Sequence, residues 1–157
     1  METQNNNQQT LTALDIASYF VQLDDTRDIE DGITNLKLQK LLYYAQGYHL
    51  AYFDKPLFAD PIKAWQYGPV VPNVYQILKQ FGRYPVDFSR DDFQKVNPSL
   101  LANDSRNLLD SVFEQLGQYS AWKLMEMTHE EDPWKHTDTD EEISHQKLKA
   151  YFETKTA

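Results

Sequence analysis

Apolar residues recur at helical spacing over most of the chain, which predicts a mainly helical protein. The first such stretch covers residues 12–23, and Thr12 with Asp15 forms a capping box at its start. A second and longer stretch begins at a cap on Thr34 or Asn35 and is apolar on two sides. A helix that is apolar on most sides is typical of the centre of a fold, so we expect the core to form around it.

The middle of the chain predicts a minor β element. Residues 62–67 alternate with period two and indicate one short strand, which Gly68 and Pro69 should end. Pro72 suits the first turn of a third helix, whose core face should include Ile77. Three more helices are expected. They cover residues 104–116, residues 120–128, and residues 139–152 behind a capping box at 139–142.

These elements predict a mainly α fold (α+β with a minor β element). We expect a compact bundle of about six helices around a central buried helix, with one short strand or hairpin. Residues 1–10 are polar and are expected to form a flexible N-terminal tail. Residues 11–157 are expected to form a single domain, since a chain of this length supports one hydrophobic core.

Composition narrows the classes of partner. The 157 residues carry 15 basic and 24 acidic side chains, a formal net charge of −9, and no cysteine. Nucleic-acid binding and membrane-surface binding both favour basic faces, so we expect neither kind of partner. No apolar run approaches the ~20 residues of a membrane helix, and no secretory signal is recognisable. We therefore expect a cytoplasmic protein, monomeric or weakly dimeric.

Few residues form patterns that indicate catalysis or metal binding. His129 and Glu130 begin like the zinc-protease pattern H-E-x-x-H, but Pro133 stands where the second histidine is required. A looser metal site is an alternative, because nitrogen and oxygen ligands lie close in sequence at His129, Glu130, Glu131, Asp132 and His136. The simpler interpretation is that His129 caps the end of its helix. Phosphate-binding loops and the G-x-S-x-G elbow are absent, so we expect no metal, no cofactor and no enzyme.

Aromatic and acidic side chains are the candidates for binding. Tyr44, Tyr48 and Tyr52 follow one another along one edge of the second helix and could pack in the core or form a partner-binding rim. Trp65 and Trp134, each near a proline, are expected to be at least half buried. The stretch from residue 130 to 142 contains seven acids and one lysine. It is either a solvated loop or a docking surface for a basic partner.

Three segments carry a resemblance to a known family. Residues 34–47 (TNLKLQKLLYYAQG), residues 64–75 (AWQYGPVVPNVY) and residues 128–134 (THEEDPW) occur in the order of the motifs of the Panacea antitoxin domain. The chain thus resembles that family, which is also described as SocA-like antitoxins and as phage-associated proteins. The positions that match its motifs are Leu38, Gln39, Lys40, Tyr43, Tyr44, Trp65, Gly68, Pro69, Pro72, Tyr75, His129, Glu131, Pro133 and Trp134.

The resemblance implies a helical domain with a small β element and an antitoxin function. Such a protein would bind and neutralise a cognate protein toxin from an adjacent gene, by blocking it or by delivering it for proteolysis. An interaction protein of a phage or mobile element, without a toxin, is the alternative, and a metal-dependent enzyme using His129 and a glutamate is a third. For the first function we expect exposed contacts at Tyr44, Tyr48 and Tyr67, because rigid aromatic anchors carry much of the binding energy at interfaces.

Overall fold

The protein folds mainly into helices, with one small antiparallel hairpin, as predicted. A computed structural model describes residues 11–27, 32–89, 93 and 96–156, so the predicted tail lies outside the described residues. The described helices are α1 (Ala13–Asp25), α2 (Asn35–Phe53), α3 (Pro72–Leu78), α4 (Asn103–Leu116), α5 (Ala121–His129), α6 (Asp132–Lys135) and α7 (His145–Glu153). The described strands are β1 (Lys63–Trp65) and β2 (Gly68–Val70).

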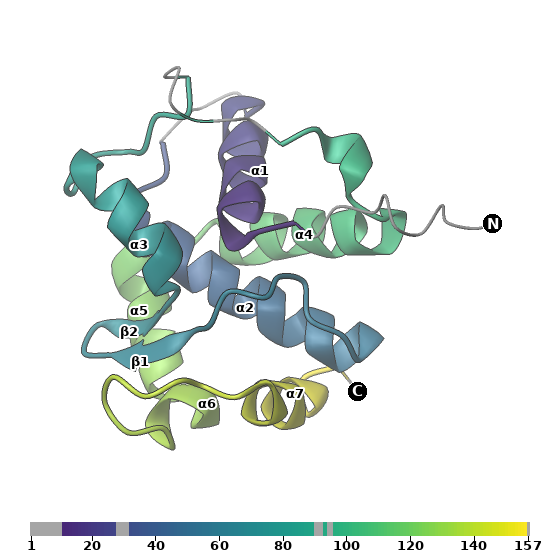
Figure 1. The fold of residues 1–157 in the computed structure, drawn as a ribbon, viewed down its shortest axis with the longest axis vertical. Coiled ribbons are helices and arrows are strands. Elements are labelled where there is room, and N and C mark those ends of the chain that lie inside the picture. The colour runs from purple at the N-terminus through teal and green to yellow at the C-terminus, as the bar shows by residue number, and fades with distance from the viewer. Residues whose placement is uncertain (1–10, 28–31, 90–92, 94–95, 157) are drawn as a thin grey trace.

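Helix α2 passes through the centre of the molecule, with α1 and α4 on one side and α6 and α7 on the other (Figure 1). Leu38, Leu41 and Leu42 belong to one predicted apolar side of the helix and are fully buried. The side chain of Thr34 caps the helix by accepting a hydrogen bond from the backbone of Lys37. Because this helix is covered on most sides, its polar residues are also drawn into the interior.

Phe152 is an aromatic side chain at the contact between the last helix and α2. Phe152 is 1% exposed and its ring meets those of Tyr43, Tyr44 and Tyr48 edge-on. Gly47 of α2 lies directly beneath it, and a Cβ at that position would overlap the Phe152 ring. The close approach of α2 and α7 therefore depends on a residue without a side chain.

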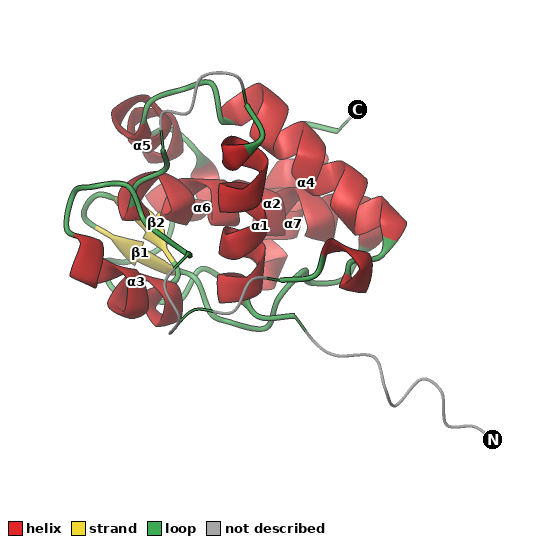
Figure 2. Cartoon of the chain, turned by 90° about the horizontal axis from the view of Figure 1, so that it is seen from above, coloured by secondary structure: helices red, strands yellow, loops and turns green. Residues whose placement is uncertain are grey.

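The structure of the hairpin differs from the prediction that the β element ends at Gly68 and Pro69. Strand β1 forms as expected, but Gly68 and Pro69 continue into β2 instead of ending the β structure. Trp65 pairs with Gly68, and the register brings Ala64 opposite Pro69. Gly68 has a φ of 106°, which only glycine adopts without strain, so the residue that suggested a stop makes the tight turn possible. Figure 2 shows the hairpin at one end of the bundle, between α3 and α5.

The predicted capping box at residues 139–142 is wrong. Residues 139–141 form a turn, with Asp140 at a φ of 69°, and Glu142 bridges Lys63 at the open edge of β1. The backbone N–H of Ala64 donates to the Glu141 carbonyl at 3.0 Å. Ile143 is buried behind it, and α7 begins only after Ser144, whose side chain caps the helix. Pairing with the strand satisfies these backbone groups, so the local capping signal is overridden.

Two smaller differences concern exposure and helix breaks. Ile77 was expected in the core but is 41% exposed, because α3 is short and covers the core with Val74 and Leu78 instead. Pro133 lies in the first turn of the short helix α6, and α5 has already ended at His129. Among the described residues no helix is long and apolar enough to cross a membrane.

Candidate functional site

The three sequence motifs meet at the first half of α2. The hairpin lies against one side of the helix through the second motif, and the α5–α6 connection lies against another through the third. Each motif contributes polar groups that bond to the other two. The site therefore has two parts, a buried carboxylate clamp and a pocket beside the hairpin.

Glu131 is the centre of the clamp. The hydroxyl of Tyr43 donates to its Oε1 at 2.9 Å, and the hydroxyl of Tyr44 donates to its Oε2 at 2.8 Å. Burial raises the pKa of the Glu131 carboxyl, although both tyrosine hydrogen bonds oppose this by favouring the ionised form. Burial also raises the pKa of the Tyr43 hydroxyl, and the neighbouring Glu131 charge raises it further. The clamp holds the start of α6 against α2.

The structure contradicts the predicted exposure of one partner contact, Tyr44. Tyr44 was expected to be exposed for a partner, but only 2% of it is accessible. Its hydroxyl is engaged by Glu131 and its ring packs edge-on against Phe152. The spacing of the tyrosines along α2 placed it correctly on one edge of the helix, but the α5–α6 connection covers that edge.

His129 does not form a catalytic pair with the glutamates. Its ring stacks on Trp134, with centroids 4.0 Å apart and an angle of 22° between the planes. Its Nε2 is buried without a hydrogen-bond partner among the described residues, and Glu131 is occupied by the two tyrosines. Within the described ranges, no group of three or more histidines and acids is placed to hold a metal ion. The geometry thus gives His129 a packing role.

The two tryptophans join the second and third motifs. The indole of Trp134 donates to the Trp65 carbonyl at 2.8 Å, and the Trp65 indole donates to Asp140 at 3.0 Å. The Trp65 ring also meets Tyr75 edge-on, with centroids 5.3 Å apart. Both tryptophans are more than half buried, as predicted.

Gln39 joins the first motif to the second. Its Nε2 donates to Asn35 at 2.8 Å, and its Oε1 accepts the backbone N–H of Val71 at 2.8 Å. The amide of Asn35 in turn donates to the Tyr75 carbonyl at 3.3 Å. Gln39 is fully buried, so these bonds satisfy groups that would otherwise be costly to bury. They fix α3 and the hairpin to α2.

Lys40 lies at the floor of the second part of the site. It is 1% exposed, and its Nζ donates to the Pro69 carbonyl at 2.9 Å. Burial lowers the pKa of its ammonium to about 7. A Cβ on Gly68 would stand 2.9 Å from Lys40 Cε, so the glycine is needed here for space as well as for its turn.

A pocket of about 310 Å³ opens beside Lys40. Trp65, Tyr67 and Tyr75 line it with aromatic surface, and Lys79 and Arg83 lie at its rim. Tyr67 is 57% exposed, so this predicted contact does lie at the surface. Sequence reasoning identified Tyr67 and the Lys40 motif but did not bring them to one pocket.

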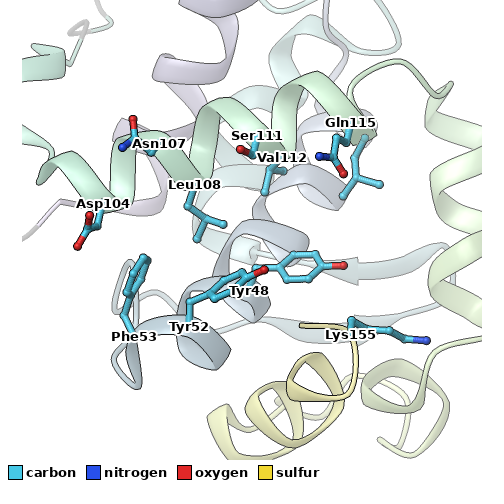
Figure 3. Close-up of a pocket in the computed structure, with 11 residues that line it drawn as sticks. Tyr48, Tyr52, Phe53, Asp104, Asn107, Leu108, Ser111, Val112, Gln115 and Lys155 are labelled. Atoms are coloured by element: carbon cyan, nitrogen blue, oxygen red, sulfur yellow. The ribbon is translucent and has the colours of Figure 1, made fainter. Parts of the chain in front are cut away.

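A second pocket of about 490 Å³ lies between α2 and α4. Figure 3 shows Tyr48, Tyr52 and Phe53 of α2 facing Leu108 and Val112 of α4 across it. Tyr48 is partly buried and stacks on Tyr52, with ring centroids 6.4 Å apart. The predicted contacts Tyr48 and Tyr67 thus belong to different pockets.

The buried lysine predicts a pH-dependent stability. The unfolded lysine has a pKa near 10.5 and the folded one near 7, so the unfolded state binds more protons between these values. The contribution of Lys40 to the free energy of unfolding must therefore rise with pH. Relative to Lys40→Met, the wild type should gain about 2 kcal/mol of unfolding free energy between pH 7 and pH 9. Urea denaturation of both proteins measures this, and a difference that stays constant with pH would contradict it.

Comparison with known proteins identifies the family of this chain. Residues 38–135 match the profile of the family described as Antitoxin SocA-like, Panacea domain. The protein Antitoxin SocA of Caulobacter vibrioides (strain NA1000 / CB15N) is 29% identical over 119 residues, which cover 71% of this chain and 63% of that protein. The match thus spans less than two thirds of this relative's length, and no solved structure matches. The profile covers more than half of the chain and reaches from the first motif to the third, so the chain belongs to the SocA-like antitoxin family that is defined by the Panacea domain.

Proposed function

We propose that this protein is an antitoxin that binds a protein toxin, encoded by an adjacent gene, and neutralises it by direct contact. The observation that carries the proposal is the match of residues 38–135 to the SocA-like antitoxin family. A relative that is named an antitoxin supports it. Delivery of the bound toxin to a protease is compatible with the same contact and is a finer form of the proposal.

The geometry of the motifs favours binding over catalysis. Glu131, Gln39 and the Trp134 indole are each occupied by a partner from another motif, and the Trp65 indole is occupied by Asp140. A catalytic acid or base must instead reach the proton that it transfers. These residues therefore hold the hairpin and α6 in place, and the surface that they support is available for a partner.

The contact surface that we propose is the hairpin turn with its pocket. Tyr67 extends from the turn, is 57% exposed, and is held by a hairpin that α2 and the two tryptophans make rigid. Large aromatic side chains on rigid elements lose little conformational entropy on binding and are enriched among residues that dominate interface energies. Tyr44 is no longer part of this surface.

The acidic stretch adds long-range attraction to the proposal. Glu130, Asp132, Asp138, Glu141 and Glu142 are all exposed, close in sequence to the residues that bond to the hairpin. Charges at the rim of an interface mainly accelerate association with an oppositely charged partner. A basic toxin surface would suit this stretch, and added salt should then slow association.

Tyr67→Ala is expected to abolish neutralisation while leaving the fold intact. Loss of an interface anchor costs about 2 kcal/mol or more of binding, roughly a thirtyfold loss of affinity. The exposed side chain contributes little to folding, so the free energy of unfolding should change by less than about 0.5 kcal/mol. Growth of cells that co-express the adjacent gene tests the first expectation, and urea denaturation tests the second.

Tyr52→Ala is the matched control. Tyr52 is 56% exposed, nearly the same as Tyr67, but lies in the pocket between α2 and α4. The control variant should rescue growth like the wild type. Rescue by Tyr67→Ala together with loss of rescue by Tyr52→Ala would move the contact surface to the α2–α4 pocket.

A further inference from the structure

Lys40 is a buried amine whose charged form lacks a counter-ion. Its Nζ has one hydrogen bond, to the carbonyl of Pro69, and no carboxylate forms an ion pair with it among the described residues. An ammonium group has three donors, so the charged form has two left to satisfy. Buried charges in proteins are generally paired, because an unpaired charge loses the solvation that water provides.

The pocket next to Lys40 has a charge opposite to that of the whole chain. The described residues that line it include the cations Lys40, Lys79 and Arg83 and no acid, whereas the chain has a net charge of −9. Trp65, Tyr67 and Tyr75 supply the aromatic walls. The pocket thus combines one buried cation, two cations at the rim and an apolar lining, which is a combination that favours an anion attached to an apolar group.

We propose that this pocket binds a carboxylate of the partner protein, with Lys40 as its buried counter-ion and the Trp65, Tyr67 and Tyr75 rings around the adjoining side chain. The inference rests on the proposed function, because it assigns the carboxylate to a protein. The group can come from the C-terminus of the partner or from an aspartate or glutamate side chain. Lys79 and Arg83 at the rim attract it before it reaches Lys40.

Charge and size both favour a carboxylate over a phosphate. A carboxylate carries one negative charge and matches the single buried ammonium, whereas a phosphate ester carries about −1.5 to −2 at neutral pH. The Pro69 carbonyl next to Lys40 Nζ would repel the excess charge of a phosphate. A volume of about 310 Å³ holds a carboxylate and one or two residues but no folded segment.

Titration of the full-length protein with four small probes tests the proposal. The probes are N-acetylphenylalanine, its neutral amide, N-acetylglutamate α-amide and phenyl phosphate, and the signal is the NMR resonance of the Trp65 indole N–H, assigned with Trp65→Phe. At ~millimolar concentrations the first probe or the third should give a saturable shift, and the amide should bind about tenfold or more weakly. Preference for the first probe identifies a C-terminus as the source, and preference for the third identifies a side chain.

Three variants decide whether Lys40 is the counter-ion. Lys40→Met, which keeps an unbranched side chain as far as Cε but removes the amine, should weaken binding of the carboxylate probe about tenfold or more. Arg83→Gln changes an exposed side chain, so it should weaken binding of the carboxylate probe less and should reduce the dependence of that binding on salt. This variant keeps the proposal testable if Lys40→Met does not fold. Lys155→Gln, at the α2–α4 pocket, should leave binding unchanged.

The outcomes separate this inference from the proposed function. Equal binding of the acid and the amide, tighter binding of phenyl phosphate, or unchanged binding by Lys40→Met would overturn the carboxylate site. The antitoxin proposal would survive that result if the wild type still rescued growth in co-expression. Conversely, the protein could bind the carboxylate through Lys40 and yet fail to rescue growth against the product of any neighbouring gene. That result would support the site and refute the proposed function.

Discussion

Glu131→Ala should destabilise the folded protein by about 2–4 kcal/mol. The substitution removes the acceptor of two hydroxyls, those of Tyr43 and Tyr44, which are 0% and 2% exposed. Each buried donor that loses its partner costs about 1–3 kcal/mol, because water cannot replace the lost bond. The midpoint of urea denaturation should fall accordingly, with α6 and α7 the first elements to lose protection from hydrogen exchange.

Glu131→Gln is the matched control for this prediction. Glutamine has nearly the same shape, keeps one side-chain oxygen as an acceptor, and offers its amide to the second hydroxyl, which can turn to accept. We therefore expect less than half of the loss caused by alanine. A loss below about 1 kcal/mol for Glu131→Ala would mean that both hydroxyls find other partners, and that the clamp does not hold the third motif in place.

Gly47→Ala should be destabilising even though alanine favours helices. The added methyl group would overlap the ring of Phe152, which is 1% exposed and cannot turn outward without moving α7. Overpacking costs about 1–3 kcal/mol, and overlap with a ring that cannot move belongs at the upper end of that range, so the gain of about 1 kcal/mol from helix propensity offsets only part of it. We expect a net loss of about 2 kcal/mol, measured by chemical denaturation.

Reducing Phe152 tests the cause of this loss. In the double variant Gly47→Ala/Phe152→Leu the smaller side chain makes room for the methyl group. The two substitutions should therefore be coupled by about 1 kcal/mol or more, with the double variant more stable than the sum of the single losses predicts. Additive losses would show that the strain arises elsewhere than at the contact between α2 and α7.

Local patterns were sufficient for the helices whose ends are set by their own side chains. Thr12 and Asp15 form the predicted capping box, and Thr34 caps α2 as expected. The pattern failed where distant segments pair. The second strand contains Gly68 and Pro69, and the edge of β1 is taken by residues about 75 positions away, such as Glu141. Such pairing satisfies backbone groups between segments that no local periodicity connects.

The candidate site was predictable in its residues but not in its arrangement. The motifs contain Lys40 and Glu131, and Tyr67 was an expected partner contact, yet the exposure of the predicted residues depended on which segments cover α2. One signal was present in the sequence, since a helix that is apolar on most sides buries its polar residues too. That signal applies to Gln39 and Lys40, which are 0% and 1% exposed, and it would have identified Tyr44 as a buried residue as well.

Titration of the purified toxin with this protein is the sharpest test of the proposed neutralisation by direct contact. The product of the adjacent gene would be assayed for its own activity while this protein is added in increasing amounts. We expect complete inhibition at a stoichiometric ratio and elution of the two proteins as one complex, which Tyr67→Ala weakens and Tyr52→Ala does not. A toxin that remains fully active in excess of this protein, or growth rescue without any complex, would contradict direct neutralisation and favour an interaction protein without a toxin.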